Sequence, residues 1–183
     1  VEFSQMAASI LTLILGTIIG ELLNLNEKAK LLSVRINSSY EKRFSSSSVD
    51  IGVFINLVVM VACSGYGVFG ALNEGISGNH TSLIVKALLD FFTFVFFAAN
   101  YGALLSFICI PQFTVYIFIY LLAGLAAPFM GTAAMGDLSA CAGVITMATG
   151  INLLFGKDIP VISMLPAFIL VLPLSQLFSL IAK

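Results

Sequence analysis

Long apolar runs separated by short polar breaks make up most of this chain. A bilayer span needs about 20 mostly apolar residues. Six runs approach that length, and they occupy residues 5–23, 51–72, 82–107, 112–127, 135–154 and 161–181. The fourth run is short, so we expect it either to span with tilt or bilayer thinning, or to be re-entrant. The pattern predicts an all-α, polytopic transmembrane bundle of about six spans, organised as one domain over residues 1–183.

Composition supports a membrane protein. Hydrophobic residues make up 60% of the chain and charged residues only 9%, whereas a soluble domain has roughly 25% charged residues. The lipid bilayer is therefore the expected partner. A net charge of -1 provides no basic surface for nucleic acid. The three cysteines lie in apolar runs without CxxC spacing, so we expect packing roles for them and no metal or cofactor.

One segment, residues 24–50, is rich in charge. It contains five of the eight basic residues, namely Lys28, Lys30, Arg35, Lys42 and Arg43. Because short cytoplasmic loops concentrate Lys and Arg, the segment is predicted to be a cytoplasmic loop. Binding of anionic lipid or of a partner by this loop is the alternative. With six spans, this orientation places both chain ends outside, and a re-entrant fourth run would reverse everything after it.

The third run contains two opposite charges inside an otherwise apolar helix. On a helical wheel its polar residues share one face, and they are Ser82, Lys86, Asp90, Thr93 and Asn100. Ionisable groups inside membranes often mark transport or proton pathways. In that interpretation Asp90 accepts a proton or cation and Lys86 is its counter-ion. In the alternative, the two form a structural ion pair, or Lys86 extends its charge toward the interface.

The second run adds polar residues to this hypothesis. Six residues follow helical steps of three and four and share a face, namely Asn56, Met60, Cys63, Gly67, Gly70 and Glu74. The predicted polar path therefore has Asn56, Thr93 and Asn100 along it, with Glu74 at its outer mouth.

Small residues and prolines predict how the helices pack. Small residues at helical spacing let helix backbones approach closely, and the predicted packing positions are Gly16, Gly20, Gly67, Gly70, Gly143 and Gly150. Such faces also suit a homo-oligomer. Pro166 and Pro173 are predicted to kink the sixth run, and discontinuous helices often line transport sites.

Catalytic motifs are missing from the sequence. It contains no HExxH, no GxSxG and no paired aspartates at helical spacing, so we do not expect an enzyme. The favoured function is a small-solute or ion transporter or channel with its path along residues 82–100. The alternative is a non-transporting membrane scaffold or sensor in which the Lys86/Asp90 pair is structural.

Several segments carry a resemblance to a known family. They are LGTIIGELL at residues 15–23, CSGYGVFGALNEGISGNH at 63–80, KALLD at 86–90, ATGINLL ending at Leu154, and MLPAFILVLPLS at 164–175. Together they make the chain similar to bacterial inner-membrane proteins of domain-of-unknown-function family 554, the YqgA/YdfK-like proteins. The resemblance implies a multi-pass protein of the bacterial inner membrane. It also implies that this chain lacks two apolar helices found at the start of family members. It supplies no established activity, although members are usually described as candidate transporters.

Overall fold

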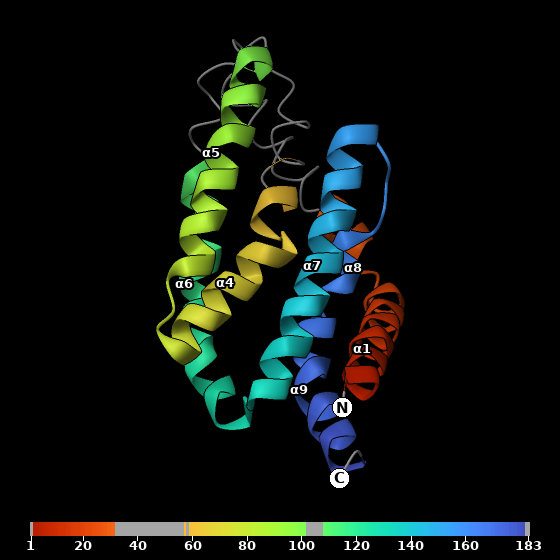
Figure 1. The fold of residues 1–183 in the computed structure, drawn as a ribbon. Coiled ribbons are helices and arrows are strands. Elements are labelled where there is room, and N and C mark those ends of the chain that lie inside the picture. Colours follow the sequence, from red (N-terminus) through yellow and green to blue (C-terminus); the bar gives the residue numbers. More distant parts are fainter. Residues whose placement is uncertain (1, 32–56, 58, 102–107, 182–183) are drawn as a thin grey trace.

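The computed structural model describes residues 2–31, 57, 59–101 and 108–181. All the elements in these residues are helical (Figure 1): α1 (Glu2–Leu22), α4 (Gly65–Ser77), α5 (Thr81–Tyr101), α6 (Cys109–Ala126), the 3₁₀ turn η2 (Ala127–Phe129), α7 (Thr132–Phe155), α8 (Val161–Met164) and α9 (Ala167–Ile181). The predicted all-α class is therefore confirmed.

The helices form two groups. In one group α4 packs against α5 and α6, and in the other α1 packs against α7, α8 and α9. The two groups meet where α4 packs against α7. At this junction Val68 of α4 lies in a buried cluster with Leu138 and Ile145 of α7 and with Phe168 and Val171 of α9. Apolar packing thus joins the two groups at the centre of the molecule.

Fewer helices than predicted meet the requirements for a membrane span. Three described helices are long and apolar enough, namely Thr81–Ala99, Ala134–Phe155 and Val161–Phe178. A fourth is obtained if Met6–Leu22 and Leu25–Leu31, which meet at a 50° bend, count as one span. The prediction of about six is therefore more than the structure shows. The apolar stretch of α6 is short, and the helix expected over residues 51–72 is interrupted. Both chain ends nevertheless lie at the same end of the bundle (Figure 1).

The interruption lies between residues 62 and 65. Residues 59–62 are helical, Cys63 and Ser64 are not, and α4 then begins at Gly65. Ser64 has extended backbone angles, φ -62° and ψ 134°. Two glycines in the three residues after Ser64 favour this break, because glycine is a weak helix former. Ser64 is the N-cap residue of α4, but its side chain makes no capping hydrogen bond. Asn56 and most of the basic segment 24–50 lie outside the described residues.

Four of the six predicted glycines lie at close helix contacts. A Cβ added to Gly16 would be 2.5 Å from the backbone nitrogen of Ala167, and one added to Gly20 would be 2.0 Å from the carbonyl oxygen of Ser163. Gly67 lies against the side chain of Tyr116, and Gly70 against Leu83.

The other two predicted glycines have no such contact within the described part of the chain. A Cβ on Gly143 or Gly150 would meet nothing within 4 Å. The reason is that α7 buries the face carrying Leu138, Cys141 and Ile145, which leaves Gly143 exposed.

The two prolines of the sixth run differ in effect. Pro166 lies in the turn between α8 and α9, so it accompanies a real interruption. Pro173 lies inside α9, and the helix continues through it. Because Gly16 and Gly20 of α1 lie against Ala167 and Ser163, α1 crosses the sixth run at this interruption.

Candidate functional site

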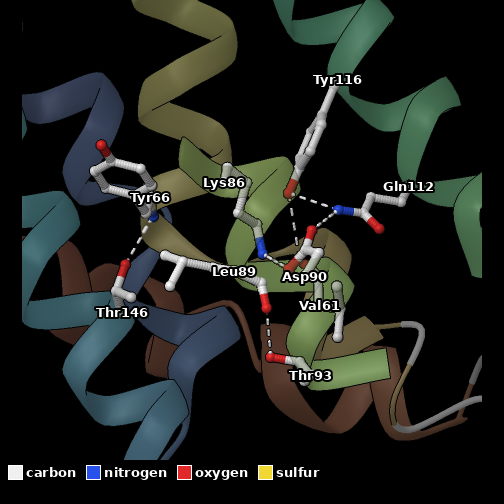
Figure 2. Close-up of polar contacts among 9 residues, drawn as sticks. All are labelled: Val61, Tyr66, Lys86, Leu89, Asp90, Thr93, Gln112, Tyr116 and Thr146. Carbon is white, nitrogen blue, oxygen red and sulfur yellow. Dashed lines mark hydrogen bonds and ion pairs between the residues drawn. The ribbon is translucent and has the colours of Figure 1, made fainter. Parts of the chain in front are cut away.

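The two charges of α5 are buried and paired with each other. Lys86 is 7% exposed and Asp90 8% exposed. The ammonium group of Lys86 donates a hydrogen bond to Asp90 Oδ1 (Figure 2). A four-residue spacing puts the two side chains on one helix face. Lys86 therefore holds its charge against Asp90 inside the bundle.

A glutamine from α6 occupies the second oxygen of the carboxylate. Gln112 Nε2 donates to Asp90 Oδ2, and Gln112 is itself only 8% exposed. The same nitrogen lies 3.3 Å from the hydroxyl oxygen of Tyr116, one turn further along α6. Both carboxylate oxygens of Asp90 thus have partners, one from α5 and one from α6.

Tyr116 connects this group to the interrupted helix. Its hydroxyl lies 3.4 Å from the carbonyl oxygen of Val61, in the last turn before the break (Figure 2). A Cβ on Gly67 would lie 1.9 Å from the same hydroxyl oxygen. The absence of a side chain at Gly67 therefore gives the tyrosine access to the first turn of α4. We call Lys86, Asp90, Gln112 and Tyr116 the polar network.

On the opposite side, α7 supplies a partner for the start of α4. The backbone N–H of Tyr66 donates to Thr146 Oγ1 at 2.7 Å, and that hydroxyl donates to the Ala142 carbonyl at 2.7 Å. The next two N–H groups, of Gly67 and Val68, both reach the Ser64 carbonyl at 3.1 Å. Backbone groups in a bilayer need protein or water partners. Both groups of helices thus supply hydroxyls to the break.

The remaining predicted path residues do not join the polar network in the described residues. Thr93 donates to the Leu89 carbonyl of its own helix at 2.8 Å. Glu74, in the last turn of α4, contacts His80 of the α4–α5 connection at 2.5 Å. Asn100 belongs to α5, but its side chain lies outside the described set, as does Asn56. Lys86 and Asp90 are therefore the two predicted residues that the structure brings together.

Comparison with known sequences now bears on the family. The profile of the family described as "Protein of unknown function (DUF554)" matches residues 1–176. The chain belongs to the DUF554 family. This confirms the resemblance found in the sequence, and the polar network lies inside the matched region.

Two relatives of this DUF554 chain are themselves described as uncharacterised. It is 33% identical to the uncharacterized protein YqgA of Escherichia coli over 177 residues, which is 96% of this chain and 75% of YqgA. It is 23% identical to the uncharacterized membrane protein YdfK of Bacillus subtilis over 162 residues, which is 88% of this chain and 66% of YdfK. No solved structure matches the chain.

Four residues of the candidate site were not predicted from the sequence, namely Val61, Gln112, Tyr116 and Thr146. Gln112 and Tyr116 had a readable signal, because a glutamine four residues before a tyrosine places two polar groups on one face of an apolar helix. The backbone carbonyl of Val61 and the hydroxyl of Thr146 had none, since their importance depends on where the second run breaks.

A second buried carboxylate also has a role that the sequence did not reveal. The N-cap of α7 is Gly131. Asp137 lies further inside α7, is 3% exposed and accepts a hydrogen bond of 2.8 Å from Ser9 of α1. It therefore links α1 to α7. Among the described residues, no group of three or more His, Cys, Asp or Glu side chains is placed to hold a metal ion.

Proposed function

We propose that this DUF554 protein moves a small solute or ion across the membrane, and that Asp90 takes up a proton or cation during the cycle. The observation that carries the proposal is the buried Asp90 carboxylate, connected through Gln112 and Tyr116 to an interrupted helix. Ionisable groups inside membranes are costly and commonly functional. Interrupted helices commonly form the binding sites of transporters.

The arrangement supports a simple cycle. While Asp90 is ionised, Lys86 and Gln112 hold it against α5 and α6. Neutralisation of the carboxylate by a proton or cation weakens both contacts. Tyr116 is then released from its position over the helix break, and the α4–α7 junction is the place where the two groups of helices shift relative to each other.

The proposal includes a location and an orientation. We place the protein in the bacterial inner membrane, surrounded by lipid, with residues 24–50 in the cytoplasm. Lys30 forms an exposed ion pair with Asp158 at 2.9 Å, which supports a common side for the basic segment and the α7–α8 connection. A homo-oligomer remains part of the proposal, because Gly143 is exposed, Gly150 is half-buried, and a Cβ on either would meet nothing within 4 Å, which leaves a small-residue face open to another helix. Transport without covalent chemistry is expected.

Flux measurements test the transport proposal. The purified chain is reconstituted into liposomes, and proton entry is followed with an internal pH dye while sodium entry is followed with a radioactive tracer. Asp90→Asn is expected to abolish the flux of the wild type. Asp158→Asn is the matched control, because it removes an exposed carboxylate, and it should transport normally. If Asp90→Asn misfolds, the double variant Lys86→Met/Asp90→Asn removes both charges and should fold without transporting.

A structural role is the second candidate, and one observation favours it. Both oxygens of Asp90 already have partners within the described residues, as expected of a sealed contact in a scaffold or sensor. In that case Lys86→Met combined with Asp90→Leu restores folding lost in Asp90→Asn. If the Asp90→Asn protein folds and its flux is unchanged, Asp90 takes no part in transport.

A further inference from the structure

The helix break contains oxygen atoms whose hydrogen bonds are weak or missing. Ser64 is 4% exposed, and its Oγ makes no hydrogen bond of acceptable geometry although it lies close to the Tyr116 hydroxyl. The Val61 carbonyl is reached by the Ser64 N–H at 3.3 Å and by the Tyr116 hydroxyl at 3.4 Å. N–H···O hydrogen bonds are usually about 2.7–3.2 Å long and O–H···O hydrogen bonds about 2.5–3.0 Å. The buried Val61 carbonyl and Ser64 hydroxyl and the half-buried Tyr116 hydroxyl therefore lie close together without a short hydrogen bond at any of them.

Three backbone donors at the start of α4 are already used. The N–H of Tyr66 is bonded to Thr146, and those of Gly67 and Val68 to the Ser64 carbonyl. These are the groups with which a helix start binds an anion. The groups left over include lone pairs on a carbonyl and two hydroxyls, which are ligands of hard cations.

The charge of the surroundings favours a monovalent ion. Asp90 is the carboxylate of the polar network, and its charge is already matched by Lys86. Calcium and magnesium sites usually contain several carboxylates or phosphates. A divalent ion here would bury two uncompensated positive charges, which is costly.

We infer that the break between Val61 and Gly65 binds Na⁺, with the Val61 carbonyl oxygen, Ser64 Oγ and Tyr116 Oη as protein ligands. Because Lys86 already matches the charge of Asp90, Na⁺ adds one positive charge to this site, half of what a divalent ion would add. The inference rests on the proposed function in that it names the ion that the transporter would use. It assigns Ser64 a ligand role, which accounts for a serine hydroxyl that is buried without a partner.

Sodium binding is measured directly on the full chain purified in detergent. Binding of radioactive Na⁺ and the melting temperature in NaCl against choline chloride at equal ionic strength are both recorded. We expect saturable binding and a melting temperature that rises with Na⁺ and not with choline. Ser64→Ala and Tyr116→Phe, which each remove one oxygen, should weaken Na⁺ binding about tenfold or more.

Ser163→Ala is the matched control. Ser163 is also a fully buried serine whose Oγ has no partner, but it lies in α8, so this variant should bind Na⁺ like the wild type. Equal binding by wild type and Ser64→Ala overturns the inference, as does a wild type that responds to Na⁺ no more than to choline, in which case a water fills the break. Saturable Na⁺ binding without flux supports the inference and refutes transport. Flux without saturable Na⁺ binding supports transport and refutes the Na⁺ site.

Discussion

At the helix break, single hydroxyl groups replace the hydrogen bonds that a continuous helix makes with itself. Thr146 is the clearest case, because its Oγ1 accepts from the Tyr66 N–H across the α4–α7 junction. Without that acceptor the N–H would be buried in the bundle with no partner. A buried unsatisfied backbone group costs about 1–3 kcal/mol, so this threonine is expected to matter more for stability than its neighbours on α7.

Thr146→Val tests this role. The change keeps the side-chain shape and removes the acceptor, so we expect the free energy of unfolding to fall by about 1–3 kcal/mol. Thr149→Val is the control, because the buried Thr149 hydroxyl donates only to the Ile145 carbonyl of its own helix in the described contacts. Unfolding in mixed detergent and dodecyl sulfate micelles, followed by circular dichroism, measures both. Equal losses would argue against a special role for Thr146.

The Lys86/Asp90 pair gives a second prediction at this scale. Lys86→Met leaves the Asp90 charge buried with a glutamine partner alone, which is expected to cost about 3–5 kcal/mol of unfolding free energy. Lys86→Met/Asp90→Asn removes the unpaired Asp90 charge and keeps an acceptor for Gln112. Most of the lost free energy of unfolding should therefore be regained. The same unfolding assay reports both values. A double variant as unstable as the single one would show that the ammonium group stabilises through packing instead.

At the scale of elements, the crossing of α1 over the α8–α9 interruption depends on the absence of side chains. Gly20 lies directly against the Ser163 carbonyl, and Gly16 against the backbone of Ala167. The atoms that a methyl group would meet belong to the backbone, which moves less readily than the end of a side chain. Close backbone approach of this kind is how small residues join helices in membranes.

Gly20→Ala should therefore separate α1 from α8. The added methyl group would stand 2.0 Å from the Ser163 oxygen, and we expect a loss of about 1–3 kcal/mol, as for overpacked cores. Gly143→Ala is the control, since nothing lies within 4 Å of its Cβ position. That change should be neutral or slightly stabilising, because alanine is the better helix former by about 1 kcal/mol. Thermal unfolding in detergent distinguishes the two, and equal melting temperatures would contradict the crossing.

The sequence predicted which segments are helical better than it predicted where a helix is interrupted. Apolar runs and small-residue spacing identified the helices and the Gly16/Gly20 contact face, because both follow from local periodicity. Ser64 and Gly67 carried a signal for a break, yet the surrounding apolar run favoured one continuous span. The partners of Asp90 could not be predicted, because Gln112 is brought to it by the packing of α6 and no local pattern determines that packing. The hydrogen bond between Ser9 and Asp137 could not be predicted either, because the packing of α1 against α7 brings these two residues together.

At the scale of the whole molecule, the two groups of helices place exposed connections at opposite ends. The α7–α8 connection carries Asp158 and the α4–α5 connection carries His80, and these lie at opposite ends of the bundle (Figure 1). Lys30 pairs with Asp158, so the basic segment starts at the Asp158 end. If basic residues determine the orientation, the Asp158 end faces the cytoplasm.

Labelling of single cysteines with a membrane-impermeant maleimide tests this orientation. Cys63, Cys109 and Cys141 are first replaced by alanine, and a cysteine is then introduced at position 158 or 80, where the native side chains are 84% and 71% exposed. We expect the cysteine of Asp158→Cys to react only in inside-out vesicles and that of His80→Cys only in right-side-out vesicles. Reaction of both from one side would contradict the opposite-end arrangement. If instead Asp158→Cys reacts only in right-side-out vesicles and His80→Cys only in inside-out vesicles, the fold stands and the basic segment lies outside the cytoplasm. Labelling of both from one side thus reveals an error in topology, and exchanged labelling reveals an error in orientation.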